Sequence, residues 1–493
     1  MRRQASRLLL SIWGRIITSL SLVGDGDTGM VRLLADEAMG GAMLNHPRHQ
    51  AAQQSLVELI QQLRAARNIE DGYALQQALL DLRLEADESY LMYRRAAIRV
   101  RAGKALQDGV PNPQSGMDPA LPETWDLERE LSERLGRQYR CIGDALAWRV
   151  FGFQRKQIIA LSQSEPVGPM ANKRGLSAEL EALEQARADG KFAILHDLTN
   201  CLRIGDVTVF DDDGTYKTIE VKSDPKRRSP AQKRKIKAAA AAVRDNAPLP
   251  GQDPKTRLYH LDLPFKTHLD VLRLGTERAA RDGIFASRIA GGRMLLVADI
   301  YGCNLQGWTE EEFEKRVESK RNSALRRAGI AADPEWLITA TSLDLVSRDP
   351  NRVPFAAYPL HPVACARIIG DLAGFFVTTN GQALAQMVRN AGVEARWVRP
   401  PTAGDLTPGE VVMEMISRTS WPASPAMERQ MQRGSLRWEK SRTLQVRRSE
   451  LDRYLIELLD QEVWLQGVKY MLEDPDLRNR PWPTYRDEHE VWV

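Results

Sequence analysis

Three residues in the stretch DVTVFDDDGTYKTIEVK (206–222) have side chains suited to metal-dependent hydrolysis. Asp206 and Glu220 carry carboxylates, and Lys222 carries an amine two positions after Glu220. Mg²⁺ prefers carboxylate oxygens and retains several of its waters, and a metal-bound water that attacks a phosphodiester is the chemistry this set would serve. Lys222 would orient that water and help to stabilise the developing negative charge. All three are therefore candidate catalytic residues.

A β-hairpin would bring the two acids together. Its strands are DVTVF (206–210) and YKTIEVK (216–222), and the aspartates between them favour a turn. With Gly214 in the left-handed position of a three-residue loop, Asp206 faces Glu220 at a Cβ separation of roughly 4.5–5.5 Å; a bulge would shift this register by one residue. Alternation then predicts two faces. The core face carries Val207, Val209, Ile219 and Val221, and the polar face carries Asp206, Thr208, Thr218, Glu220 and Lys222.

Directly opposed carboxylates destabilise a sheet unless a cation bridges them, so this register favours a metal site. The alternative is an exposed hairpin with salt-bridged charges. A second Glu-x-Lys triplet, Glu318 to Lys320, occurs within FEKRVESKRNSALRRAG (313–329). That pattern is helical, and residues two apart on a helix do not share a face, so we interpret the second copy as solvated surface.

The candidate site resembles the PD-(D/E)xK nuclease superfamily, whose fold is restriction-endonuclease-like. Its signature is an acid on one strand followed by (D/E)-x-K on the adjacent strand, matched here by Asp206 and by Glu220-Val221-Lys222. The resemblance covers about residues 140–265. It implies that Asp206 and Glu220 bind Mg²⁺ or Mn²⁺ with a contribution from the Val221 carbonyl, and that Lys222 is the catalytic lysine.

The sequence differs from that signature at one position and leaves a second one open. Gly205 stands where the superfamily has a nominal proline. Many members also carry an acid on the first core helix, and the sequence does not select among the candidates for it. These candidates are Asp144, Glu179, Glu181 and Glu184.

A basic segment follows the candidate site. Ser229 and Pro230 form a favourable N-cap and N1 pair, which predicts that a helix starts there. Its cations suit contacts with a phosphate backbone, and its alanine run is small enough to pack on a sheet; a solvated basic face is the alternative. The resemblance adds a functional glutamine. The predicted nucleic-acid-binding residues are Gln232, Lys233, Arg234 and Lys237.

The pair His196-Asp197 precedes the hairpin. Adjacent residues on a strand point to opposite faces, so the pair is not interpreted as a catalytic dyad. We assign His196 a structural role.

The surrounding elements predict an α/β protein. We expect a restriction-endonuclease-like core, with a mixed central sheet flanked by helices, together with a helical N-terminal region and an additional C-terminal α/β region. Helical periodicity runs through 31–108 and 127–161, and the Pro/Gly-rich stretch 108–125 is the best linker. The expected regions are 1–125, 126–265 and 266–493. Further strands are expected at 192–197, 257–263, 293–302, 341–347, 374–379 and 410–417, and a helical pair at 445–473.

The composition is that of a globular protein. Hydrophobic residues make up 43% and charged residues 27%, with a formal net charge of +4, so nucleic-acid binding would depend on where the charge lies. Four cysteines without a CxxC pattern argue against a disulfide framework or structural zinc and predict buried free thiols. The basic N-terminus fits a short amphipathic helix better than a signal peptide. No stretch is apolar enough to span a membrane. We therefore expect a cytoplasmic location.

Together these features predict a Mg²⁺-dependent nuclease that hydrolyses phosphodiester bonds in DNA through a site of two acids and a lysine. One alternative is a non-catalytic nucleic-acid-binding or assembly protein with a degenerate nuclease fold. Another is an unrelated α/β protein whose hairpin only mimics the motif. Retention of both acids and the lysine favours the enzyme. A homodimer or a protein partner bound through residues 266–493 also stays open.

Overall fold

The structure is a computed structural model. It describes residues 46–163, 168–211, 213–221, 230–245, 247–250, 266–330, 333, 335–342, 352–400, 409–420 and 439–473. The helix expected near the N-terminus, the strand expected at 257–263 and the candidate catalytic Lys222 lie outside these residues.

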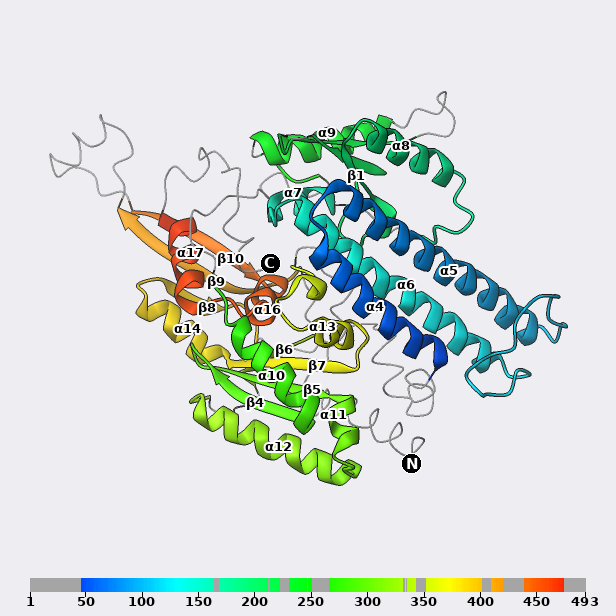
Figure 1. The fold of residues 1–493 in the computed structure, drawn as a ribbon. Helices are drawn as coiled ribbons and strands as arrows, with labels where there is room; N and C mark the ends of the chain where they lie inside the picture. The colour runs from blue at the N-terminus through cyan, green and yellow to red at the C-terminus, as the bar shows by residue number, and fades with distance from the viewer. Residues whose placement is uncertain are drawn as a thin grey trace.

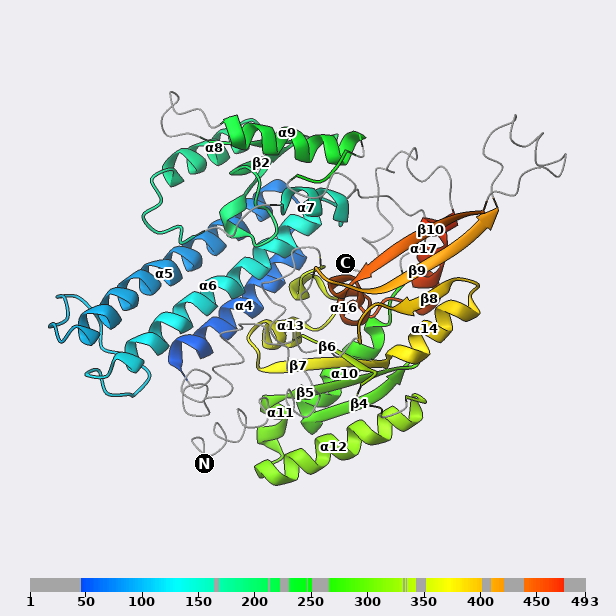
Figure 2. The same cartoon turned by 180° about the vertical axis from the view of Figure 1, so that it is seen from behind.

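Three long helices lie side by side in the N-terminal half of the chain: α4 (Pro47–Ala65), α5 (Ile69–Arg101) and α6 (Pro122–Val150) (Figures 1 and 2). Proline at the first helical position favours the start of α4 and of α6, because its fixed φ suits that position and its missing N–H costs nothing there. The side chain of Asn68 caps α5 by accepting from the Asp71 N–H. Helix α6 begins within the stretch expected to be a linker and continues through residue 150.

The first sheet is a three-stranded antiparallel meander in the order β1-β2-β3. Its strands are β1 (Phe192–Leu195), β2 (Val207–Phe210) and β3 (Tyr216–Ile219). The short helix η1 (His196–Leu198) follows β1. The flanking helices are α7 (Arg155–Leu161), α8 (Leu176–Ala188) and α9 (Pro230–Asp245). All described strand pairs in this sheet are antiparallel, whereas a mixed sheet was expected. The strand expected at 257–263 falls outside the described part of the chain.

The outer edge of β1 is paired with a side chain instead of a strand. The Gln76 amide of α5 donates to the Ala193 carbonyl over 3.0 Å, and its oxygen accepts from the Leu195 N–H over 2.7 Å. Two backbone groups that a neighbouring strand would otherwise satisfy are thereby satisfied inside the core.

The hairpin has the predicted register. Val207 pairs with Ile219 and Thr208 with Thr218, and Gly214 has a φ of +80°, the left-handed conformation that the turn requires. Asp213 accepts from the Thr215 N–H, which confirms a turn role for this aspartate. The strands are shorter than expected: Asp206 comes just before β2, and Glu220 and Val221 come just after β3.

The second sheet is antiparallel with the order β4-β5-β7-β6. Its strands are β4 (Ile284–Ile289), β5 (Arg293–Asp299), β6 (Leu337–Thr341) and β7 (Ala373–Asn380). The associated helices are α10 (Leu269–Asp282), α11 (Ile300–Leu305), α12 (Glu310–Arg327), η3 (Phe355–Ala357) and α13 (Pro362–Ile369). Every residue of β5 is buried. Met294 and Leu296 join a core shared with α12, whereas Leu295 and Val297 join the main core with α10, so helices cover both faces of this sheet.

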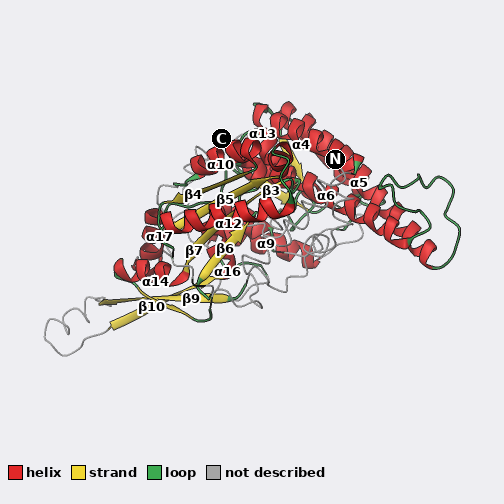
Figure 3. Cartoon of the chain, turned by 90° about the horizontal axis from the view of Figure 1, so that it is seen from below, coloured by secondary structure: helices red, strands yellow, loops and turns green. Residues whose placement is uncertain are grey.

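The third sheet forms a ribbon at the end of the molecule opposite the loop between α5 and α6 (Figure 3). Its order is β10-β9-β8, with β8 (Glu394–Trp397), β9 (Val411–Ser420) and β10 (Glu439–Arg447). The helices nearby are α14 (Gly381–Asn390), α16 (Arg448–Ile456) and α17 (Gln461–Glu473). The helical pair expected from residue 445 therefore begins at 448, because β10 continues to Arg447. The strand expected at 341–347 is displaced: β6 ends at Thr341, and 343–351 lie outside the described residues.

These findings establish a mixed α/β protein with three small antiparallel sheets in its described part. The Glu318–Lys320 triplet lies on α12, as the helical pattern predicted. All four cysteines are free and buried, which was also expected. None of the described helices is long and apolar enough to cross a membrane.

A buried ion pair links α7 to α16 across a long stretch of sequence. The guanidinium of Arg155 donates two hydrogen bonds to the Glu457 carboxylate, over 3.1 and 3.0 Å. Glu457 is 0% exposed and also accepts from the Val353 N–H and from Arg453. Burial alone would raise the pKa of Glu457, but Arg155 and Arg453 outweigh it and the pKa is lowered.

Replacing Glu457 with Ala removes this carboxylate and leaves the Arg155 guanidinium buried without its counter-ion. We expect the free energy of unfolding, measured by urea denaturation, to fall by about 3–5 kcal/mol. The control is Glu311→Ala, which breaks an exposed ion pair with Lys315 and should leave the unfolding free energy close to the wild-type value. Equal effects of the two changes would contradict the importance of the buried pair.

Candidate active site

Asp206 is fixed between the two neighbouring strands of the first sheet. Its N–H donates to the Ile219 carbonyl and its carbonyl accepts from the His196 N–H, both over 2.9 Å. Its side-chain Oδ2 accepts from the Val221 N–H over 2.8 Å. The hairpin register runs from Val207–Ile219 to Phe210–Tyr216. Because the Asp206 N–H also donates to the Ile219 carbonyl, the register shifts by one residue at Asp206, so the direct Asp206–Glu220 opposition that was expected is replaced by the bulge that was the alternative. Asp206 and Val221 are thereby joined at the open end of the hairpin, and Glu220 is the residue before Val221.

One of the four candidate helix acids faces this site. Glu179 of α8 is only 2% exposed, and Asp206 is among the charges that act on it. Glu181 and Glu184 lie on the exposed side of α8. Asp144 has a different task, because its carboxylate accepts from the backbone N–H groups of residues 200 and 201 over 2.5 and 2.8 Å.

Lys173 connects Glu179 to a further acid. Its Nζ lies 2.7 Å from Glu179 Oε1 and 2.6 Å from Asp197 Oδ2. Lys173 therefore bridges two carboxylates, those of Glu179 and Asp197, and Asp206 acts on Glu179 through its charge. We call these four residues the acid cluster.

Burial and the neighbouring charges together raise the pKa of Glu179 to about 7. Burial is the largest cause, since it disfavours the ionised form, and the negative charges of Asp197 and Asp206 act in the same direction. Lys173 opposes them but does not outweigh them. Glu179 therefore changes its protonation near neutral pH.

Sequence reasoning missed Lys173 and Asp197. Asp197 belongs to the His196-Asp197 pair, which was expected on a strand; η1 instead turns the chain and lets Asp197 reach Lys173. Lys173 lies in an irregular segment before α8, where no periodicity marks it. The only available signal was the proximity of charged residues to the predicted site strand.

The His196 side chain is buried and hydrogen-bonded within the sheet, which is consistent with the structural role assigned to it. Its ring is 1% exposed, and its Nε2 lies 2.8 Å from Thr208 Oγ1, which in turn lies 2.8 Å from Thr218 Oγ1. Burial lowers the pKa of His196 to about 3, so the ring is neutral at physiological pH. The hydrogen bonds that link His196 through Thr208 to Thr218 also explain why Thr208, on the polar face of β2, is buried.

The predicted nucleic-acid-binding residues of α9 separate into two groups. Lys233, Arg234 and Lys237 are exposed. Gln232 is half-buried and lies four residues before Ile236, on the stripe through which α9 packs. The alanine run contributes to that packing as expected, since Ala239 and Ala242 are each 1% exposed.

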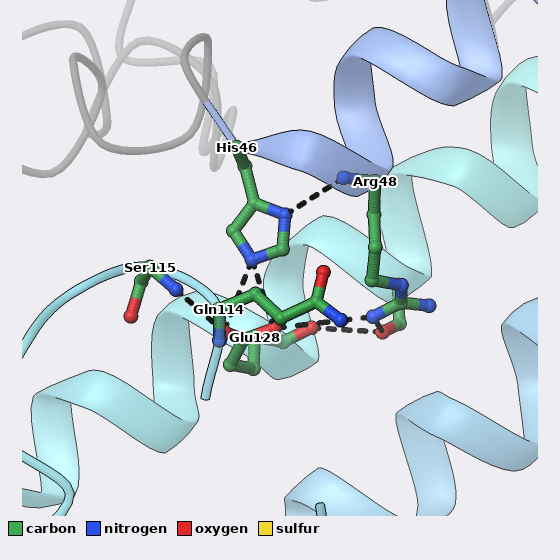
Figure 4. Close-up of polar contacts among 6 residues, drawn as sticks. His46, Arg48, Gln114, Ser115 and Glu128 are labelled. Atoms are coloured by element: carbon green, nitrogen blue, oxygen red, sulfur yellow. Dashed lines mark hydrogen bonds and ion pairs between the residues drawn. The ribbon is translucent and has the colours of Figure 1, made fainter. Parts of the chain in front are cut away.

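A second buried polar cluster lies at the start of α4 and α6 (Figure 4). The Glu128 carboxylate accepts from the Gln114 and Ser115 N–H groups over 2.7 and 3.1 Å, and the His46 ring lies 3.0 Å away. Burial would raise the pKa of Glu128, but these partners together hold it below its ordinary value. Because Glu128 is fully engaged with protein groups, we assign this cluster to holding the loop before α6 against α4.

In the part of the chain that the structure describes, no group of three or more His, Cys, Asp or Glu side chains is placed to hold a metal ion. Asp206 supplies a carboxylate at the open end of the hairpin, and Glu220 and the Val221 carbonyl follow directly after the neighbouring strand β3. Mg²⁺ is commonly held by one or two carboxylates, with substrate phosphates and water as its other ligands. The chemistry of this donor set fits such an ion.

Comparison of the chain with protein-family models, curated proteins and solved structures finds no match.

Gly205 fixes the backbone immediately before Asp206. Its φ of +85° is excluded for proline, whose ring holds φ near −65°, which explains the glycine at this position. A Cβ at Gly205 would collide with the Thr218 side chain and lie 3.1 Å from the Ile219 carbonyl oxygen.

We therefore expect Gly205→Ala to lower the free energy of unfolding by about 3 kcal/mol, because steric overlap adds to backbone strain. Gly214→Ala is the matched control: its φ is +80°, but the space around it is open, so only the backbone cost of about 1–2 kcal/mol should appear. Chemical denaturation of both variants measures the difference. Equal losses of unfolding free energy in the two variants would contradict the close approach of β3 to Gly205.

The raised pKa of Glu179 predicts a pH-dependent stability. The folded state holds this proton more tightly than the unfolded state, so the stabilisation is complete below pH 4.5 and is lost as the pH rises through about 7. Glu179→Gln cannot ionise. Its stability relative to wild type should rise by up to about 3 kcal/mol across that interval, as measured by thermal unfolding at several pH values. The exposed Glu184→Gln should follow the wild type, and a pH-independent difference for Glu179→Gln would contradict the shift.

Proposed function

We propose that this protein is a metal-dependent nuclease that hydrolyses phosphodiester bonds in DNA, with a core of the PD-(D/E)xK type. The observation that carries the proposal is the position of Asp206. Asp206 accepts a hydrogen bond from the N–H of Val221, the residue after Glu220, and its charge acts on the buried acid Glu179. These residue types, and the hydrogen bond that joins Asp206 to the end of β3, support the proposal.

The order of elements supports the same proposal. Helix α8 is followed by β1, β2, β3 and the basic helix α9, which is the expected succession of helix, three strands and helix. Of the four candidate helix acids, Glu179 is buried and under the influence of the Asp206 charge, so we propose it as the helix acid of the core. We also propose that the protein is cytoplasmic and that residues 266–493 bind a second copy of the chain or a protein partner.

Asp206, Glu220 and the Val221 carbonyl would hold Mg²⁺ or Mn²⁺. When bound, such an ion activates a water for attack on phosphorus and stabilises negative charge on the phosphate oxygens. The chain itself orients Asp206 through three backbone hydrogen bonds. Lys222, which lies outside the described residues, is proposed to orient the water.

The exposed cations of α9 would hold the phosphate backbone. Lys233, Arg234 and Lys237 share the solvent-facing side of one helix, and contacts of this kind give affinity without reading the base sequence. Gln232 is less suited to this role, because it lies on the packed side.

The test is cleavage of plasmid, linear duplex DNA and RNA by the purified protein with Mg²⁺ or Mn²⁺, and with EDTA as the metal-free control. We expect DNA cleavage that EDTA abolishes. Asp206→Asn and Glu220→Gln should each lower the rate by about 10²–10³, because each removes charge from the proposed metal site while keeping the side-chain shape. Glu184→Gln, an exposed acid on α8, is the matched control and should cleave like wild type.

Two results would overturn the proposal: no cleavage of any substrate by the folded wild type, or unchanged cleavage by Asp206→Asn and Glu220→Gln. Salt-sensitive DNA binding without cleavage would favour the non-catalytic nucleic-acid-binding alternative, since the α9 cations would then act alone.

A further inference from the structure

Lys173 is held in place by the core beneath it. Three residues earlier, Met170 is 0% exposed and its N–H donates to Asp87 of α5 over 2.6 Å. The Lys173 N–H donates to the Met170 carbonyl over 2.9 Å, and Asn172 between them has a φ of +68°. This turn fixes the backbone from which the Lys173 side chain extends, and the side chain is only 28% exposed.

Both partners of Lys173 are acids that water reaches poorly. Glu179 is 2% and Asp197 is 5% exposed. Leaving two such carboxylates without a cation would be costly, and each lies within 2.7 Å of the ammonium group. Lys173 is therefore the cation that allows both acids to be buried together. This pair adjoins Asp206, because Asp197 follows His196, whose N–H donates to the Asp206 carbonyl over 2.9 Å.

The same ammonium group must affect any other cation that the site binds. A divalent ion at Asp206 and Glu220 is attracted by Glu179 and Asp197 and repelled by Lys173, and these interactions are only partly screened in a half-buried site. Removal of Lys173 would leave the three carboxylates of the acid cluster with no balancing charge among its members.

We propose that Lys173 is a positioning residue that acts as the resident counter-ion of the acid cluster, holding Glu179 beside Asp206 and weakening the attraction of the site for divalent cations. The inference rests on the proposed function to the extent that Asp206 belongs to the metal site. It concerns regulation of metal affinity by a residue outside the predicted catalytic set.

The inference predicts a gain of metal affinity. Lys173→Met should tighten the dissociation constant of Mn²⁺, measured by electron paramagnetic resonance of the free ion, by about tenfold. Lys173→Arg keeps the charge and should bind Mn²⁺ like wild type. If Lys173 had only a structural role, Lys173→Met would weaken Mn²⁺ binding, because the acid cluster would be damaged.

The control is Lys191→Met, which breaks the exposed ion pair between Lys191 and Asp211 in the same sheet and should not alter Mn²⁺ affinity. Circular dichroism and thermal unfolding establish that each variant is folded; if Lys173→Met does not fold, Lys173→Gln, which is neutral and polar, replaces it. Asp206→Asn should weaken Mn²⁺ binding in both the wild-type and the Lys173→Met backgrounds.

Unchanged or weaker Mn²⁺ binding by the folded neutral variant overturns the inference. If wild-type protein nevertheless shows Asp206-dependent DNA cleavage, the proposed function stands and only the role of Lys173 fails. Absence of Mn²⁺ binding by wild type overturns both the inference and the metal-dependent part of the proposed function. Tighter binding by Lys173→Met but not by Lys173→Arg or Lys191→Met supports it.

Discussion

The structure depends on the buried polar side chains of α6. A charged group removed from water without a partner costs several kcal/mol, so each one requires a specific segment of chain beside it. Glu128 is met by His46 and the loop at Gln114, Arg134 by Asp371 of the C-terminal half, and Asp144 by the backbone of residues 200 and 201. One helix thereby sets the positions of three regions that are far apart in the sequence.

This arrangement reaches the candidate site through the loop between η1 and β2. Asp144 satisfies two N–H groups of that loop, and a Cβ at Gly143 would collide with the Leu198 carbonyl oxygen, so η1 packs directly on the α6 backbone. The same short segment carries Asp197 into the acid cluster and leads to Gly205. The position of Asp206 is therefore determined by packing against α6 as well as by the hairpin.

The hairpin could be predicted from the sequence because its determinants are local. Alternation in 206–222 and a glycine at the turn are enough to fix the register of β2 and β3. Lys173 could not be predicted, since it meets Glu179 and Asp197 only after the irregular segment before α8 and the turn at η1 have been placed. The same limit applies to the choice of Glu179 over Asp144: both are acids on helices, and only tertiary structure shows which one faces Asp206 and which one caps a loop.

The pairing of Gln76 with the edge of β1 has a consequence for how this sheet can grow. An open strand edge invites another strand, from the same chain or from a neighbouring molecule. Because the amide of Gln76 already occupies Ala193 and Leu195, strand addition at the β1 side would first require displacement of α5. Among the described strands, the β1 edge of this sheet is therefore protected by a side chain of α5 instead of by a further strand.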